Sequence, residues 1–185
     1  MGLSSAYSFL QTDKGYVGLS SYERKMITKV DRFESSDTWT VPSGVTYAVA
    51  HIRGGGGGLG SGTNAGTGGT SSVAFASGTI SATGGAPINA NFGGGGGPQE
   101  KMKMAGAANS GCGAKGVVSP TNYGDGERFF TSAGDGAYVV AGGAVTAGTG
   151  ITVTVGAGGA AGTYGALTGV AGGGGYVWIE YQVAP

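Results

Sequence analysis

GGGGYVWIEYQV, residues 172–183, decides the fold class of this chain. Four consecutive glycines lead into eight residues dominated by valine, isoleucine, tyrosine and tryptophan. Because β-branched and aromatic residues favour strands, we expect a strand over residues 176–183. Residues 151–155, ITVTV, have the same character and precede another glycine-rich stretch. Strands that alternate with glycine runs are therefore the pattern to follow along the chain.

Further short segments alternate polar and apolar residues, as strands do. These segments are residues 38–42, 46–53, 72–76, 128–131 and 137–141. No convincing helix interrupts them after residue 32. The sequence therefore predicts an all-β fold, a β-sandwich of jelly-roll type with glycine-rich insertions.

The composition predicts a thin hydrophobic core. The chain has 185 residues, of which 44 are glycine, and only 6 Phe, 2 Trp and 4 Met supply large apolar side chains. Small cores often need help from oligomerisation. We therefore expect a homo-oligomer with cyclic symmetry, a trimer.

Charge and cysteine content exclude several classes of protein. The 10 basic and 10 acidic residues cancel, so nothing attracts the chain to nucleic acid or to an anionic membrane. Cys112 is the only cysteine, which rules out an intrachain disulfide. We see no signal peptide, lipidation signal or membrane-spanning stretch, and we expect folding in a reducing cytoplasm.

Charge and glycine divide the chain into two parts. Residues 1–53 contain 11 of the 20 charged residues but only 4 of the 44 glycines. We interpret residues 1–32 as an N-terminal arm and residues 33–185 as a glycine-rich β-sandwich domain. Within the arm, residues 21–30 predict a short helix, because Tyr22, Met26 and Val30 recur every four residues. Two interpretations stay open: a docking helix or frayed arm without further role, and an arm that attaches the protein to a partner through this stripe.

Three glycine runs, residues 54–58, 93–97 and 172–175, cannot form ordinary helix or strand interiors because ordering them costs too much backbone entropy. Flexible linkers are one interpretation, although linkers favour serine and lie between domains. The other is a bundle of polyproline II helices, which have three residues per turn and no internal hydrogen bonds. Their backbone groups must find lateral partners, and glycine lets neighbouring helices approach closely enough. We expect all three runs to be ordered and packed together.

From Phe33 onward the chain resembles a known family. The resemblance rests on WTVPSGVT at residues 39–46, TSSVAFASGTISATGG at residues 70–85, ITVTVGAGG at residues 151–159 and GGGGYVWIEY at residues 172–181. In this combination and order they resemble the glycine-rich tail-fibre and tail-tip adhesin proteins of bacteriophages. Residues 1–32 match nothing in that family.

The resemblance implies a β-sandwich with glycine-rich helical insertions and a structural role in a virion, with recognition of a host surface glycan or protein. On that basis we expect a non-enzymatic virion protein, joined to other virion proteins through residues 1–32. A capsid decoration or head-fibre protein without receptor binding is the alternative. A depolymerase is a third hypothesis, and it requires clustered carboxylates in a cleft.

Motifs for catalysis or cofactors are weak. Gly156, Gly158 and Ala161 fit a dinucleotide fingerprint after a strand, but the segment that should form the crossover helix is too rich in glycine and threonine. His51 is the only histidine and lies inside an expected strand, so we interpret it as a packed or rim residue. Acidic residues 125, 127 and 135 stand among Gly-Asp-Gly turns rather than at calcium-loop spacing. We expect no enzyme activity, no cofactor and no metal.

The segments that connect the glycine runs, residues 98–104 and 117–130, contain larger polar, charged and aromatic side chains. Aromatic and arginine side chains dominate binding hot spots, and Asn or Asp can hydrogen-bond sugar hydroxyls. We therefore predict receptor contacts through four residues: Asn122, Tyr123, Asp125 and Arg128. For Phe129 and Phe130 we expect instead the start of a strand, with one ring buried.

Overall fold

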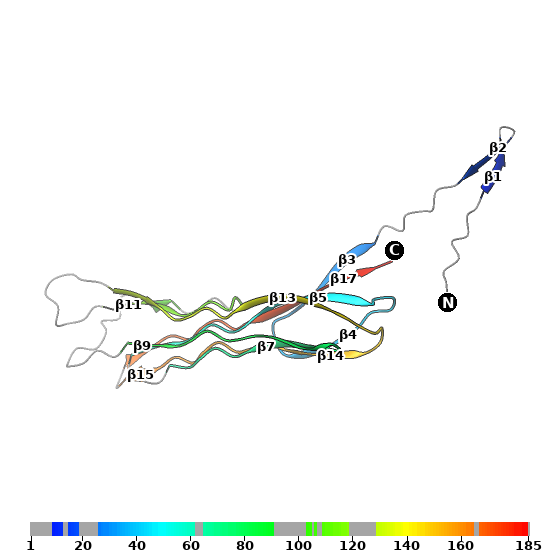
Figure 1. Cartoon of the computed structure of the whole chain (residues 1–185). Helices are drawn as coiled ribbons and strands as arrows, with labels where there is room; N and C mark the ends of the chain where they lie inside the picture. Colours follow the sequence, from blue (N-terminus) through cyan, green and yellow to red (C-terminus); the bar gives the residue numbers. More distant parts are fainter. Residues whose placement is uncertain are drawn as a thin grey trace.

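Two four-stranded antiparallel sheets contain the longest strands of the protein (Figure 1). The computed structural model describes residues 9–12, 15–18, 26–61, 65–90, 103–104, 106, 109–118, 129–164 and 167–184. In the order in which they pair, the first sheet consists of β13 (Tyr138–Ala144), β5 (Tyr47–Arg53), β17 (Tyr176–Val183) and β3 (Ile27–Phe33). The second consists of β4 (Asp37–Thr40), β14 (Gly150–Thr154), β7 (Ser71–Phe75) and β8 (Gly78–Ala82).

The other strands are short. They are β1 (Phe9–Thr12) with β2 (Gly15–Gly18), β6 (Leu59–Ser61) with β9 (Ile88–Ala90), β10 (Lys103–Met104) with β11 (Lys115–Val118) and β12 (Phe129–Ser132), and β15 (Thr163–Tyr164) with β16 (Leu167–Thr168). None of the described residues is helical, which confirms the prediction of an all-β fold. In this part of the chain there is accordingly no helix long and apolar enough to cross a membrane.

Side chains from both four-stranded sheets meet in one hydrophobic cluster. Alternation along β5 buries Ala48, Ala50 and Ile52, while the residues between them lie on the opposite face of the sheet. Val73 and Val153 contribute to the same cluster from the second sheet. Valine is the most frequent residue of this cluster, and Trp39, Phe75 and Tyr181 supply its aromatic rings.

The structure of β3, the N-terminal strand of the first sheet, differs from one prediction. Residues 27–30, expected in a helix, belong to β3, which pairs with β17 from Ile27↔Val183 to Phe33↔Val177. A repeat of four residues is also a multiple of two, so Met26 and Val30 share a face of a strand as well as of a helix. The neighbouring β-branched residues Ile27 and Thr28 favour the strand. The division expected between residues 32 and 33 falls inside β3.

Seven glycine-rich segments extend from the sheets side by side (Figure 1). We call them the glycine lattice. Its central segment is residues 54–59, which directly follow β5. The six segments around it, in the order in which neighbours hydrogen-bond to each other, are residues 66–69, 83–88, 133–137, 111–114, 169–175 and 156–162, and the last bonds again to the first.

The central segment distributes its hydrogen bonds with a period of three. Its N–H groups donate, at 2.8–3.0 Å, to three segments in turn: residues 54 and 57 to the segment 133–137, residues 55 and 58 to 66–69, and residues 56 and 59 to 169–175. Its carbonyl groups accept from the other three: residues 55 and 58 from the segment 83–88, residues 56 and 59 from 156–162, and residue 57 from 111–114. The Leu59 carbonyl accepts in addition from the Val170 N–H at 3.1 Å. Every one of the six neighbours is therefore bonded to the centre.

The backbones of neighbouring segments approach residues 54–58 closely, and this explains why these residues are glycine. A Cβ atom at any of residues 54–58 would overlap a backbone carbonyl oxygen, for example that of Ala86 at Gly57 and that of Cys112 at Gly56. Backbone of a neighbouring segment cannot move aside as a flexible side chain can. The glycines at this centre are thus required by contact between backbones.

Ser71 joins the lattice to the sheets. Its side chain is fully buried, its hydroxyl donates to the Arg53 carbonyl oxygen at 2.7 Å, and it accepts from the Gly156 N–H at 2.9 Å. Arg53 is the last residue of β5, and Gly156 lies just beyond β14. One side chain therefore connects the points where two segments leave the two sheets.

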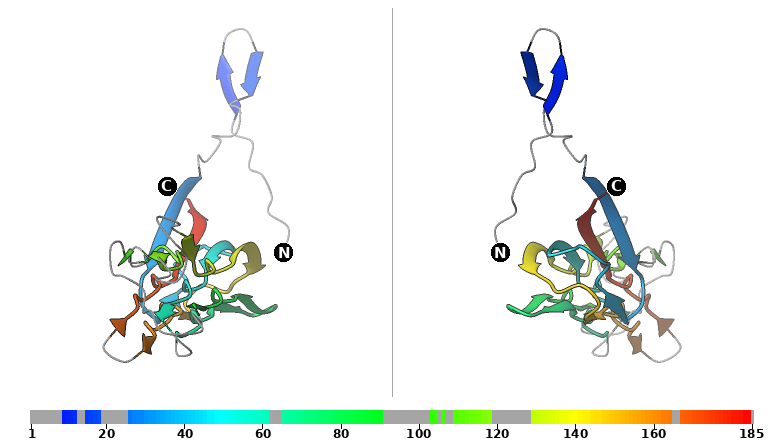
Figure 2. Two further views of the ribbon diagram at one scale, coloured as in Figure 1. Left: turned by 90° about the vertical axis from the view of Figure 1, so that its left-hand side faces the viewer. Right: turned by 90° about the vertical axis from the view of Figure 1, so that its right-hand side faces the viewer.

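Two of the three expected glycine runs lie in the lattice, and the Gly56 N–H donates to the Gly173 carbonyl oxygen. The third, residues 93–97, lies outside the described residues. Figure 2 views the molecule along the segments: in the left panel the short strands at the end of the lattice face the viewer, and in the right panel the four-stranded sheets do.

Candidate functional site

The four residues predicted to contact a receptor, Asn122, Tyr123, Asp125 and Arg128, lie outside the described residues. The strands on either side of them are described. β11 and β12 pair as far as Val118↔Phe129, so these two residues, which flank the predicted contact segment, lie side by side. Figure 1 shows β9, β11 and β15 at the end of the lattice remote from the four-stranded sheets. Phe129 and Phe130 begin β12, as expected.

The stripe predicted for attachment is described in part. Tyr22 lies outside the described residues, as do residues 98–102 of the other bridging segment. Met26 precedes β3 and is 48% exposed, and Val30 lies within β3 and is 56% exposed. Because β3 pairs only with β17 among the described strands, these apolar side chains stand at the edge of a sheet.

Sequence reasoning missed a cluster of aromatic residues on the outer face of the first sheet. Register places Arg53 between Tyr138 and Tyr176, and His51 between Val140 and Trp178. We call this surface the aromatic face; its residues are Tyr47, His51, Arg53, Tyr138, Val140, Tyr176, Trp178 and Glu180. The alternation of aromatic residues at 176 and 178 is a signal that could have revealed it, since it puts both rings on one face.

Four rings follow one another across three strands. Tyr176 and Trp178 stack, with ring centroids 5.3 Å apart and planes 22° apart. The His51 ring lies 5.8 Å from that of Trp178 and 6.3 Å from that of Tyr138. A hydrogen bond of 2.8 Å joins His51 Nδ1 to the Tyr138 hydroxyl, and His51 Nε2 lies 3.8 Å from the Glu180 carboxylate. These contacts hold the rings in fixed positions while Tyr138 remains 48% exposed.

Tyr47 occupies the other end of the aromatic face and is 57% exposed. Its ring lies against Gly142 of the neighbouring strand, where a Cβ would overlap the Tyr47 hydroxyl and approach Cε1 to 2.9 Å. The absence of a side chain at 142 therefore gives this ring its place over β13.

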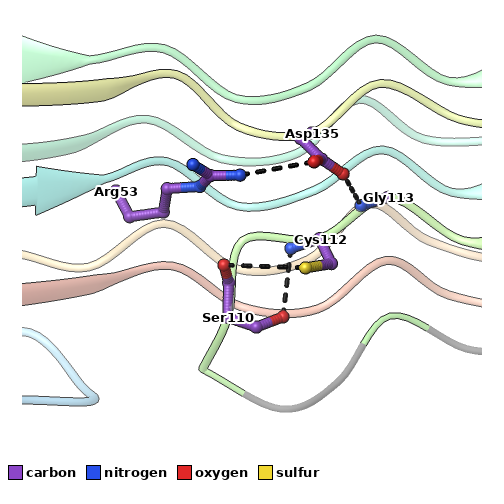
Figure 3. Close-up of polar contacts among 5 residues, drawn as sticks. All are labelled: Arg53, Ser110, Cys112, Gly113 and Asp135. Atoms are coloured by element: carbon purple, nitrogen blue, oxygen red, sulfur yellow. Dashed lines mark hydrogen bonds and ion pairs between the residues drawn. The ribbon is translucent and has the colours of Figure 1, made fainter.

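A polar corner connects the aromatic face with the glycine lattice (Figure 3). Asp135 lies 3.4 Å from the Arg53 guanidinium and accepts a hydrogen bond of 2.7 Å from the Gly113 N–H. Cys112 donates from its backbone N–H to the Ser110 hydroxyl at 3.1 Å. Gly111 has φ +65°, and a Cβ there would overlap the Arg53 side chain. This turn holds Arg53 in place, although its Nε has no hydrogen-bond partner among the described residues.

The aromatic face is rich in residue types that are common in binding surfaces. Tyrosine, tryptophan and arginine are the residue types that dominate binding hot spots. Asp135, the described member of the acidic trio weighed for calcium or glycosidase chemistry, is paired with Arg53, whereas residues 125 and 127 lie outside the described part. Within that part, no three His, Cys, Asp or Glu side chains are grouped so as to hold a metal ion.

Comparison with known proteins identifies no relative: no family model, no curated protein and no solved structure matches this chain.

Proposed function

We propose that this chain is a non-enzymatic structural protein of a bacteriophage virion, a tail-fibre or tail-tip adhesin that binds the host cell surface. The observation that carries the proposal is the glycine lattice, in which six segments surround residues 54–59 and lead to short strands at one end. Such a scaffold has few side chains to reorder, so it would lose little entropy on binding.

In this proposal the two sheets form a jelly-roll-like β-sandwich, and the glycine segments are helices of polyproline II type. The threefold period of the hydrogen bonds supports the helices, since that helix has three residues per turn and directs its backbone groups outward. The shared hydrophobic cluster supports the sandwich. An experimental structure with φ near −75° and ψ near +145° along residues 54–58 would test the first point.

Opposite ends of the molecule take different roles in this proposal. Receptor contact belongs to the segment between β11 and β12, with Asn122, Tyr123, Asp125 and Arg128 as the contact residues. Attachment to other virion proteins belongs to residues 1–32, with the exposed Met26 and Val30 at the edge strand. The assembled protein is a homotrimer on the virion surface, a state that sedimentation of the purified chain measures directly.

The decisive experiment separates adsorption from assembly. Virions carrying Tyr123→Ala together with Arg128→Ala should contain the protein in normal amount but adsorb to host cells at least tenfold more slowly. Unchanged adsorption, with the protein present, would favour the alternative, a capsid decoration or head-fibre protein without receptor role.

A second experiment tests attachment. Deletion of residues 1–25 leaves β3 in place, so the remaining chain should fold yet be absent from particles. Normal incorporation of the shortened protein would refute the attachment role of this segment. Localising the protein in a reconstruction of the virion distinguishes tail from capsid.

A further inference from the structure

The aromatic face has an exposed ring, that of Tyr47, away from the end of the lattice. Tyr47 presents an exposed ring that is backed by the bare backbone of Gly142. Glu180 pairs with Val49, two residues from Tyr47 on the same face of the sheet, and its carboxylate lies 3.8 Å from His51 Nε2. An exposed aromatic surface thus lies beside hydrogen-bond acceptors.

The charges around this ring define what it can accept. Arg53 is paired with Asp135, and Arg32, opposite Trp178, is paired with Glu34 at 3.1 Å. An anionic ligand would therefore have to compete with a carboxylate already placed beside each of these two arginines. The Glu180 side chain, 47% exposed beside His51, repels anions and accepts hydrogen bonds from neutral donors.

A pyranose ring without charge meets these requirements. One side of the sugar presents C–H groups that can pack on an aromatic ring, and its edge presents adjacent hydroxyl groups that a carboxylate can accept. Acidic sugars and nucleic acids would have to compete with Glu34 and Asp135 for the two arginines.

We propose that the aromatic face binds an uncharged saccharide, with a sugar ring on Tyr47 and its hydroxyl groups at Glu180. The inference concerns a site separate from residues 119–128. The inference rests on the proposed adhesin role, but the experiment that tests it uses the isolated protein.

Saturation-transfer NMR on the full chain tests it with four probes: maltohexaose, cellohexaose, mannohexaose and, as the acidic comparison, hexagalacturonate. At least one neutral hexasaccharide should receive saturation at its C–H protons, and hexagalacturonate should bind at least tenfold more weakly. Tyr47→Ala should lower the association constant tenfold or more. Gly142→Ala should lower it as well, because the new methyl group displaces the Tyr47 ring without removing any group that touches the sugar.

Thr152→Ala is the matched control, since Thr152 is exposed on β14 of the other sheet. It should bind like wild type, and far-ultraviolet circular dichroism should show all three variants folded. Absence of binding by every neutral probe would overturn the inference, as would unchanged binding by the Tyr47 and Gly142 variants. So would oligomerisation of wild type that Tyr47→Ala abolishes, because a second copy would then cover the face. Virion incorporation is measured in a separate experiment. The saccharide-binding results therefore neither support nor refute the proposed function.

Discussion

The indole Nε1 of Trp39 donates a hydrogen bond of 2.8 Å to the carboxylate of Asp31. Trp39 lies on β4 of the second sheet and Asp31 on β3 at the edge of the first, so this bond links the two sheets beside the hydrophobic cluster. The Trp39 ring also contacts that of Tyr181, with centroids 5.4 Å apart. An edge strand is thereby tied to the opposite sheet as well as to β17.

Asp31→Ala should destabilise the protein by about 1–3 kcal/mol, because it leaves the buried Trp39 N–H without an acceptor. Urea unfolding measures the loss. Asp37→Ala, which removes an exposed carboxylate, is the control and should cost no more than about 0.5 kcal/mol. A double-mutant cycle with Trp39→Phe should give a coupling energy of about 1 kcal/mol or more; strict additivity would contradict the link.

Burial of Tyr181, and next to it the hydrogen bond and negative charge of Asp31, raise the pKa of this phenol above 10.0. The unfolded chain then releases the Tyr181 proton at a lower pH than the folded protein does, so this contribution to stability is complete below pH 10 and is lost as pH rises through the folded pKa. Tyr181→Phe should flatten the fall in unfolding free energy above about pH 10.

Tyr47→Phe is the matched variant for the Tyr181 experiment, since Tyr47 is 57% exposed. Removal of this exposed hydroxyl gives the reference with which the Tyr181→Phe slope is compared. Equal slopes for wild type and Tyr181→Phe would show that the phenol is not the responsible group.

Gly57→Ala should destabilise the lattice by about 3 kcal/mol or more, because its Cβ would overlap the Ala86 carbonyl oxygen. Gly174→Ala lies in the same lattice, but its nearest contact is the Asn109 Oδ1 at 3.5 Å, an ordinary distance. It should stay within about 0.5 kcal/mol of wild type. Thermal unfolding of the pair checks this, and similar melting temperatures would argue against close backbone packing at the centre.

Ser71→Ala should cost about 1–3 kcal/mol, because it leaves the Arg53 carbonyl and the Gly156 N–H without their shared partner. The exposed Ser81 on the adjacent strand provides the comparison, and Ser81→Ala should change stability by less than about 0.5 kcal/mol. Chemical denaturation measures both. A neutral Ser71→Ala would mean that the two backbone groups find other partners.

Strands with strong local signals could be predicted from sequence. β17 has the predicted bounds, and β14 is shifted by one residue from the expected 151–155, because β-branched and aromatic residues distinguish both strands from the glycines next to them. β3 could not be predicted from sequence, because the spacing of Met26 and Val30 fits both a helix and a strand. Pairing with β17, a contact between residues far apart in sequence, decides between the two.

The arrangement of the glycine lattice could not be read from sequence either. Its segments have similar composition, and nothing local distinguishes residues 54–59 as the centre from residues 169–175 as a neighbour. Only the three-dimensional pattern of hydrogen bonds assigns the places. The aromatic face was missed for a related reason: Tyr47, His51 and Trp178 come together only once strands distant in sequence have paired.

The enclosure of residues 54–58 also constrains the gene. Every amino acid that a single-nucleotide change can put in place of glycine brings a Cβ atom, and each of these five positions has a neighbouring backbone where that atom would have to lie. Mutations that survive there should be almost entirely synonymous. The codons of residues 76–77, in the exposed turn between β7 and β8, meet no such restriction. Amino-acid changes in this lineage should therefore accumulate elsewhere in the chain, while the codons of residues 54–58 change only at silent positions.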